Sequence, residues 1–280
     1  MTGTSDLQTK IKAVACDLDG TLLNKNNEIH PSDLNAFKVL GEMGICRIIA
    51  TGRSLFSFRQ VIPDDFPIDY LILCAGGGTI DFKTKQVINS SVIPAEDVRR
   101  IASKLRSFKI DYQVRDVIPN DHFYKYERFF DENPDFDRLN RHYESFTEPV
   151  QAIEDLADAS RIISIAPGSD YIEFFESFAS DFGIIRATSP TDHRSVWMEV
   201  YPHGVNKGRA LSKLLRMNSL SLDETLGLGN DYNDIHFLDI TGRSFVVDNA
   251  PQALKAKYET TVNHNQAPLS AALLNCGIKI

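Results

Sequence analysis

The sequence is poor in the features that mark secreted and membrane-spanning proteins. Its four cysteines, Cys16, Cys46, Cys74 and Cys276, lie far apart without CxxC spacing, which favours buried free thiols over disulfides or metal ligands. No hydrophobic run approaches membrane-spanning length, and the first residues, MTGTSDLQTKIK, lack the apolar stretch of a signal peptide. We therefore expect a cytoplasmic protein with no membrane partner.

An excess of positive charge is also absent. The 280 residues include 30 Lys and Arg against 38 Asp and Glu, a net charge of -8. This balance does not favour nonspecific binding to nucleic acid, although local basic residues could hold a small anionic substrate. The seven histidines show no metal-ligand spacing. The length allows about two domains, and the hydrophobic content of 42% allows a sizeable core.

Short apolar runs alternate with helical patterns at both ends of the chain. The runs expected to be strands are residues 13–16, 45–50, 70–74, 196–200, 225–228, 244–247 and 260–262. This alternation predicts an α/β fold with a doubly wound, mostly parallel sheet. The middle of the chain is rich in aromatic residues and has a different pattern. We therefore expect a core domain of residues 1–83 and 193–280, interrupted by an inserted α/β lobe of residues 84–192.

Two carboxylates follow the first apolar run. In the segment DLDGTLL, Asp17 and Asp19 are two residues apart, so an extended backbone would point both to the same side. Like charges that close require a cation or a shared proton. Gly20 and Thr21 break the extended run, as a turn out of a sheet requires. The pair predicts a hard metal ion, with a simple acidic turn as the alternative.

Other polar residues also follow expected strands. Thr51, Gly52 and Arg53 come after residues 45–50, the cluster at 230–234 comes after 225–228, and Lys207 opens a helix after 196–200. Ligands bind at the carboxyl ends of strands in such sheets, which predicts one shared site. Each residue also has a simpler interpretation. Thr51 could cap a helix at 54–62, Lys207 could be a solvated helix residue, and Arg53 could pair with an acidic neighbour instead of a substrate.

The segments DLDGTLL, ATGR, GVNKGRAL and GNDYND, with VDNAPQALK downstream, resemble in order the motifs of haloacid dehalogenase-like (HAD) phosphohydrolases. The resemblance is specifically to the Cof-type group, with C2 type B caps, and it covers essentially the whole chain. It implies a Rossmann-like core with an α/β cap inserted between the second and third motifs. In that group the cap sets substrate selectivity.

The resemblance also implies roles for individual residues. Asp17 would be the nucleophile that forms an aspartyl-phosphate, and Asp19 the general acid and base. Thr51 and Lys207 would complete the catalytic set by holding the phosphoryl oxygens. Residues expected to bind phosphate or substrate are Thr51, Gly52, Arg53, Lys207 and Asn233. The expected cofactor is Mg²⁺, with Asp17, Asp19, Asn230 and Asp234 as its residues.

Two positions depart from the family pattern. Asn230 stands where the family places a metal-binding carboxylate; its amide oxygen suits Mg²⁺ but carries no charge. Our hypothesis is that Asp17, the main-chain carbonyl of Asp19 and Asn230 hold the metal, with Asp234 mostly behind them and a weaker affinity as the result. Asp231 could instead turn inward. In addition, residues 75–78 read Ala-Gly-Gly-Gly where many relatives show Asn-Gly-Ala, so that asparagine amide is missing.

The sequence thus predicts a Mg²⁺-dependent phosphatase, a phosphoric monoester hydrolase acting on a small phosphorylated metabolite, with a sugar phosphate as the leading candidate. Two alternatives remain. One is a phosphomutase of the same fold that resembles phosphomannomutases. The other, motivated by Asn230, is a non-catalytic protein that binds a phosphorylated metabolite. The sequence identifies neither the substrate nor the oligomeric state.

Overall fold

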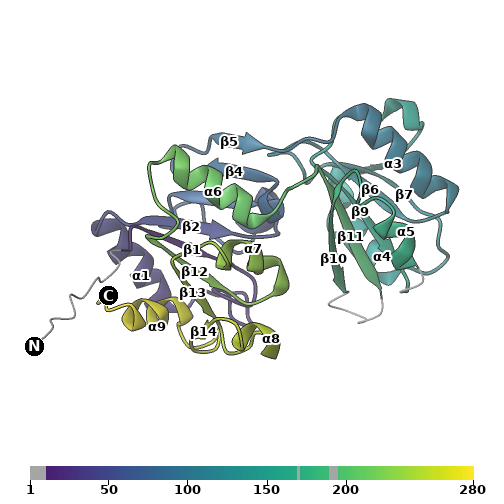
Figure 1. The fold of residues 1–280 in the computed structure, drawn as a ribbon. Helices are drawn as coiled ribbons and strands as arrows, with labels where there is room; N and C mark the ends of the chain where they lie inside the picture. Colours follow the sequence, from purple (N-terminus) through teal and green to yellow (C-terminus); the bar gives the residue numbers. More distant parts are fainter. Residues whose placement is uncertain (1–10, 169–170, 189–194) are drawn as a thin grey trace, which may run out of the picture. The chain divides into compact units, whose positions relative to one another are not determined.

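A computed structural model describes residues 11–168, 171–188 and 195–280. The chain divides into two compact units (Figure 1). Unit 1 contains the chain up to Arg53 together with Arg59–Ile88 and Asn206–Ile280, and unit 2 contains Ser54–Phe58 and Asn89–Val205. The first and the last segments that the structure describes therefore both belong to unit 1, where the purple and the yellow segments lie in Figure 1.

Among the described residues, unit 1 is built on an eight-stranded sheet with the order β14-β13-β12-β1-β2-β3-β4-β5. Its strands are β1 (Ala13–Cys16), β2 (Cys46–Ala50), β3 (Tyr70–Leu73), β4 (Gly78–Asp81), β5 (Val87–Ser90), β12 (Thr225–Gly229), β13 (Arg243–Val246) and β14 (Glu259–Thr260). The strands from β14 to β3 pair in parallel, and β4 runs antiparallel to β3. All four residues of β1 are buried, as expected for a central strand covered on both faces.

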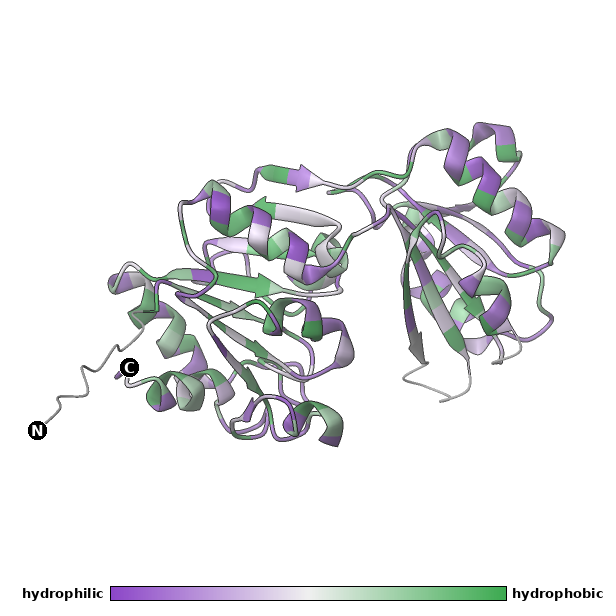
Figure 2. Cartoon of the chain, in the orientation of Figure 1, coloured by the Kyte–Doolittle hydropathy of each residue, from purple (hydrophilic) through white to green (hydrophobic). Residues whose placement is uncertain are grey.

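Helices precede or follow these strands along the chain. They are α1 (Pro31–Glu42), α6 (Lys207–Met217), α7 (Ile235–Leu238), α8 (Gln252–Lys255) and α9 (Pro268–Asn275), with 3₁₀ turns η1 (Cys74–Gly76) and η5 (Tyr232–Asp234). Pro31 occupies the first turn of α1, where its missing N–H costs nothing, and the His30 side chain accepts a hydrogen bond from the Ser32 N–H. Figure 2 shows hydrophobic residues concentrated on the central strands of this unit.

The order of the strands changes direction at β1. From β1 the chain proceeds to one edge through β2 and β3, and from β12 it proceeds to the other edge through β13 and β14. The carboxyl ends of β1, β2 and β12 therefore surround the point where the connections diverge, which is where open α/β sheets bind ligands. The predicted doubly wound, mostly parallel sheet is confirmed.

Unit 2 contains a six-stranded sheet in the described residues, with the order β10-β11-β9-β6-β7-β8. Its strands are β6 (Tyr112–Arg115), β7 (Tyr124–Glu127), β8 (Thr147–Pro149), β9 (Arg161–Ala166), β10 (Gly183–Thr188) and β11 (Val196–Tyr201). The helices are α3 (Ala95–Ser107), α4 (Pro134–His142) and α5 (Ile172–Glu176), with 3₁₀ turns η2 (Glu144–Phe146) and η3 (Ile153–Asp155), and α2 (Leu55–Arg59) begins in this unit.

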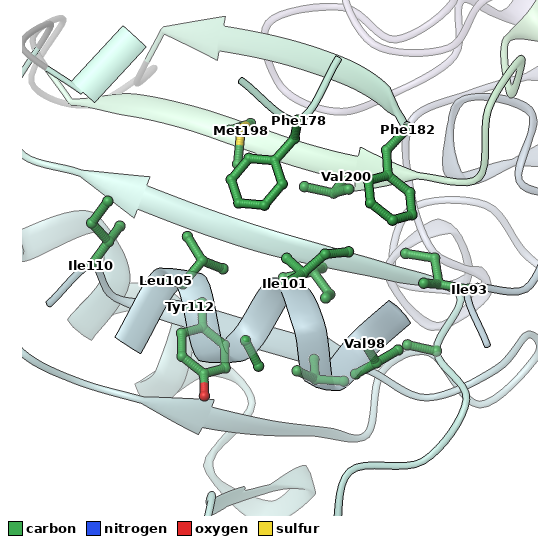
Figure 3. Packing of buried hydrophobic residues seen from close by; sticks show 14 of the residues in the cluster. Ile93, Val98, Ile101, Leu105, Ile110, Tyr112, Phe178, Phe182, Met198 and Val200 are labelled. Atoms are coloured by element: carbon green, nitrogen blue, oxygen red, sulfur yellow. The ribbon is translucent and has the colours of Figure 1, made fainter. Parts of the chain in front are cut away.

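Successive side chains along the strands point to opposite faces, and both faces of this second sheet are packed. Tyr112 of β6 and Met198 of β11 join Leu105 of α3 in one buried cluster (Figure 3). On the other face, Ile163 of β9 packs with Phe136 of α4. Side chains two apart on a strand share a face, which explains this division. The inserted α/β lobe expected from the sequence is therefore present, with its own hydrophobic core.

The predicted boundaries differ from these units. The strand expected at 196–200 exists, but as β11 it pairs antiparallel with β9 and β10 in unit 2, so placing it in the core domain was wrong. At the other end, β5 belongs to the sheet of unit 1, although residues from 84 onward were expected in the inserted lobe. A short apolar run indicates a strand but not its partner, because pairing depends on residues far away in the sequence.

In the described part of the chain, no helix combines the length and hydrophobicity needed to cross a membrane. The four cysteines are free thiols, and Cys16 and Cys74 are buried.

Candidate active site

Asp17 lies at the carboxyl end of β1, in the centre of the sheet of unit 1. Its N–H donates to the carbonyl of Leu228 at 2.8 Å, so the ladder to β12 continues to this residue. The side chain is 6% exposed. Its Oδ2 accepts a hydrogen bond from the Thr21 hydroxyl at 2.9 Å. The turn after Asp17 thus folds back and fixes the orientation of the carboxylate.

Lys207 reaches this carboxylate from the first residue of α6. Its Nζ lies 2.7 Å from Oδ1 of Asp17 and 2.7 Å from Oδ1 of Asp234. The side chain is 1% exposed. Asn206 caps α6 by accepting a hydrogen bond from the Arg209 N–H at 2.8 Å, which places Lys207 at a fixed helix start. The simpler interpretation of Lys207 as a solvated helix residue is therefore wrong.

Asp234 holds the loop after β12 together. Its Oδ2 accepts hydrogen bonds from the N–H groups of Asn230 at 2.9 Å and Asp231 at 3.1 Å, while its Oδ1 bonds Lys207. A Cβ on Gly229 would lie 2.7 Å from Asp234 Oδ2, so only glycine allows this close packing. Both oxygens of Asp234 are engaged by protein groups.

The charges at this site do not balance. Two buried carboxylates share one ammonium group, which leaves one excess negative charge when Asp17 and Asp234 are both ionised. Burial and the neighbouring carboxylate of Asp234 raise the pKa of Asp17 to about 7, whereas Lys207 acts to lower it. Burial opposes the charge on Lys207, but the two carboxylates outweigh it and raise the pKa of that ammonium. The site therefore favours an additional cation.

Thr51, Asp19 and Arg53 form a second group on the same edge of the sheet. The Thr51 hydroxyl accepts a hydrogen bond from the Arg53 N–H at 3.1 Å and lies 3.5 Å from Oδ2 of Asp19. The Arg53 guanidinium donates to both oxygens of Asp19 at 2.7–3.0 Å. Arg53 therefore pairs with an acidic neighbour in this structure, which was one of the two interpretations of this residue. Asp19 is half exposed.

Asn230 and Asp231 occupy different environments. A Cβ on Gly20 would lie 2.4 Å from Nδ2 of Asn230, so the Asn230 side chain packs directly against the turn that follows Asp17. Asp231 is exposed, and its carboxylate caps η5 by accepting a hydrogen bond from the Tyr232 N–H at 2.7 Å. Asn230, and not Asp231, is therefore the residue of this loop that faces the first motif.

The donor set fits Mg²⁺. No group of three or more His, Cys, Asp and Glu suited to a metal ion occurs in the described residues, so a site here must include other oxygens. A metal ion here would be offered the buried Asp17 carboxylate, the Asn230 side-chain amide, which packs against Gly20, and the main-chain carbonyl of Asp19. Mg²⁺ prefers oxygen ligands and keeps several waters. The excess negative charge around Asp17 is consistent with such a cation.

Gly52 and Asn233 contribute less to this geometry. Both are exposed, and a Cβ on Gly52 would meet nothing within 4 Å. Asn233 lies in η5 beside Asp234.

The contact between Thr21 and Asp17 was not predicted from the sequence: the Thr21 hydroxyl donates a hydrogen bond to the Asp17 carboxylate. Its signal was available, because a hydroxyl four residues after a carboxylate in a tight turn can reach back to it.

This combination of a doubly wound core, an inserted α/β unit and a carboxylate–lysine–carboxylate site has counterparts in known proteins. Residues 14–271 match the model of the haloacid dehalogenase-like hydrolases. The chain belongs to that family.

Individual relatives match over most of their length. The chain is 26% identical over 266 residues to the 5-amino-6-(5-phospho-D-ribitylamino)uracil phosphatase YwtE of Bacillus subtilis (strain 168), covering 88% of this chain and 91% of that protein. It is 24% identical over 267 residues to the pyridoxal phosphate phosphatase YbhA of Escherichia coli (strain K12), covering 91% and 94%.

Solved structures share the fold. The phosphatase BT1666 from Bacteroides thetaiotaomicron superposes with a TM-score of 0.79 at 22% identity, covering 100% of this chain and 99% of that one. The HAD subclass IIB sugar phosphatase BT4131 superposes with a TM-score of 0.74 at 20% identity, covering 96% and 100%. The predicted resemblance to the Cof-type group is confirmed.

Proposed function

We propose that this protein is a Mg²⁺-dependent phosphatase that hydrolyses a small phosphorylated metabolite through an aspartyl-phosphate on Asp17. The family supports a phosphoric monoester hydrolase, and the two relatives described above are phosphatases of small phosphorylated compounds. The observation that carries the proposal is the buried Lys207, whose Nζ lies 2.7 Å from both Asp17 and Asp234. A buried cation beside a buried carboxylate at the carboxyl ends of the strands suits phosphoryl transfer.

In the first step, a carboxylate oxygen of Asp17 attacks phosphorus and the ester bond to the leaving group breaks. The alkoxide takes a proton from the Asp19 carboxyl group, and the phosphoryl group remains on Asp17. In the second step, water attacks the same phosphorus and gives its proton to the Asp19 carboxylate. The bond to Asp17 breaks, inorganic phosphate leaves, and both residues return to their starting states.

Lys207 and Thr51 stabilise the phosphoryl oxygens in this scheme. Lys207 favours the ionised form of Asp17 and offers positive charge to the developing transition state. Thr51 is buried, with its hydroxyl between the Arg53 N–H and Asp19. Arg53, Gly52 and Asn233, predicted as further substrate contacts, are proposed to line the same site.

Asp17, the main-chain carbonyl of Asp19 and the Asn230 amide would hold Mg²⁺, and Asp234 would position Lys207 and the loop behind these ligands. When bound, Mg²⁺ supplies positive charge that screens Asp17 from the approaching phosphate dianion. Because Asn230 is neutral, we expect the affinity for Mg²⁺ to be weaker than with an aspartate at this position.

A sugar phosphate is the substrate that we propose first. One structural relative is described as a sugar phosphatase, but others act on a ribitylaminouracil phosphate and on pyridoxal phosphate. The shared chemistry is a phosphate monoester on a small organic molecule. The predicted contribution of residues 84–192 to selectivity among such molecules remains a prediction.

The test is phosphate release from a panel of phosphorylated sugars, nucleotides and cofactors, with Mg²⁺ and with EDTA, by the wild type and Asp17→Asn. We expect Mg²⁺-dependent phosphate release that disappears in Asp17→Asn. Isomerised sugar phosphate that depends on a bisphosphate activator would indicate a phosphomutase instead. No turnover of any compound, with binding retained, would indicate a non-catalytic binding protein.

A further inference from the structure

The turn that follows β3 has an unusual backbone. Cys74, Ala75 and Gly76 all have positive φ, at 50°, 54° and 105°. All three are buried. Cys and Ala rarely adopt the left-handed region, because their Cβ atoms crowd the following carbonyl. Such conformations persist only where the surrounding structure enforces them, and they are frequent at functional sites.

This turn is bonded to the second motif. The Cys74 N–H donates to the carbonyl of Arg53 at 2.9 Å, and the Ala75 N–H donates to the carbonyl of Thr51 at 3.0 Å. The left-handed conformation directs these two successive N–H groups to the strand end that carries Thr51. The turn is therefore fixed to the same backbone that presents the Thr51 hydroxyl.

The same turn contacts the backbone immediately before Lys207. A Cβ on Gly76 would lie 2.4 Å from the Asn206 carbonyl oxygen and 3.0 Å from the Lys207 nitrogen. These are main-chain atoms, so no side-chain movement could relieve the overlap. Gly76 thus allows η1 to pack directly on the first residue of α6.

Gly208 makes a corresponding contact with α7. A Cβ there would lie 2.1 Å from the carbonyl oxygen of His236 and 2.5 Å from its carbonyl carbon. Consequently, the backbone on both sides of Lys207 contacts another main-chain segment, η1 before it and α7 after it. The position of the Lys207 Cα is fixed by these two contacts, and its side chain extends from there to Asp17 and Asp234.

We propose that Gly76 and Gly208 are positioning residues for Lys207, and that the left-handed turn at residues 74–76 fixes Lys207 and Thr51 relative to each other. This inference rests on the proposed function, because it assigns the positioned ammonium to the phosphoryl group. It explains why two non-glycine residues keep an unfavourable backbone conformation at this turn. The turn keeps this conformation because it contacts the backbone at both Thr51 and Lys207.

The test compares Gly76→Ala with Gly44→Ala. Gly44 also has a positive φ, 72°, but a Cβ there would meet nothing within 4 Å, so this control carries the backbone strain without the collision. The thermal midpoint of each variant reports the strain. The dissociation constant for orthovanadate in the presence of Mg²⁺, measured by calorimetry, reports the phosphoryl site and does not require turnover. Steady-state kcat and KM are measured on the best substrate of the panel.

We expect both variants to lower the thermal midpoint. Only Gly76→Ala should weaken orthovanadate binding, by about tenfold, and lower kcat by about 100-fold, since a displacement of about 1 Å at a catalytic group can cost that much. KM should change much less than kcat. Gly208→Ala should behave as Gly76→Ala does. Orthovanadate binding and kcat at wild-type levels in Gly76→Ala would overturn the proposal.

A second pair of variants covers the case in which Gly76→Ala does not fold. Ala75→Val introduces a β-branched residue at φ 54°, and Ser219→Val does the same at φ 56° on an exposed residue. We expect weaker orthovanadate binding for Ala75→Val only, and equal binding in both variants would overturn the proposal. A wild type that binds orthovanadate but releases no phosphate would contradict the proposed function, while these affinities would still decide the positioning role.

Discussion

Nζ of Lys207 lies 2.7 Å from Oδ1 of Asp17, although 190 residues separate them in the sequence. Both side chains are buried, and Asp234, in the loop after β12, accepts a hydrogen bond from the same ammonium group. A single buried cation therefore joins the end of β1, the start of α6 and the loop after β12. Stability and activity should both depend on it, but in ways that can be separated.

Replacing Lys207 should lower the stability of the protein as well as its activity. Lys207→Met leaves two buried carboxylates without their shared cation, so we expect the free energy of unfolding to fall by about 3–5 kcal/mol, as for other broken buried ion pairs. Urea denaturation measures this loss. Lys12→Met is the control, because Lys12 pairs with Glu224 on the surface, and such pairs contribute about 0–1 kcal/mol. Equal losses in the two variants would contradict the account.

Asp17→Asn should separate activity from stability. The substitution removes one of two like charges that share Lys207, so the thermal midpoint should stay the same or rise while turnover is lost. Differential scanning calorimetry and phosphate release measure the two effects. Asp231→Asn is the matched control, since its carboxylate is exposed and caps η5, and it should retain turnover. A marked loss of stability in Asp17→Asn would mean that its charge is needed for folding.

Asn230→Asp should strengthen Mg²⁺ binding. It adds a negative charge beside the Asp17–Gly20 turn, and we expect binding at least about tenfold tighter, equal to about 1.4 kcal/mol. Titration calorimetry of the metal alone measures this affinity. Tyr232→Asp adds the same charge to the same loop at a position that is 55% exposed, and it should have little effect. An unchanged affinity in Asn230→Asp would remove Asn230 from the proposed metal ligands.

Asp33 should make stability depend on pH. It is buried at the start of α1 and accepts hydrogen bonds from the Ser270 N–H and hydroxyl, each at 2.8 Å. Burial raises the pKa of Asp33 although the Ser270 hydrogen bonds act to lower it. The folded state therefore binds this proton more tightly than the unfolded state, whose pKa is about 4. Stability from this group is present at low pH and is lost as pH rises through the folded pKa.

The comparison is urea denaturation of the wild type and Asp33→Asn from about pH 4 to pH 8. The wild type should lose stability relative to Asp33→Asn as pH rises, because asparagine keeps an acceptor for Ser270 without a charge. Asp65→Asn, an exposed position, should run parallel to the wild type. A difference that grows in the opposite direction would refute the assignment.

Much of this site could be predicted from the sequence. Asp17 follows a buried apolar run and Lys207 opens a helix, both as predicted. The strand-end argument holds for Asp17 but not for Lys207, because the strand before Lys207 lies in the sheet of unit 2. The sheet that contains β11 could not be predicted, because residues 196–200 form an apolar run compatible with either unit. Similarly, the Arg53–Asp19 pair and the left-handed turn at Ala75 depend on contacts between distant segments.

The most direct test of the central claim is a rapid acid quench of a single turnover with Mg²⁺, followed by mass spectrometry of the peptides. We expect phosphate to be transiently attached to the peptide carrying Asp17, and we expect neither this adduct nor turnover in Asp17→Asn. Substrate hydrolysis by the wild type with no phosphorylated peptide at any time, together with turnover by Asp17→Asn, would contradict it.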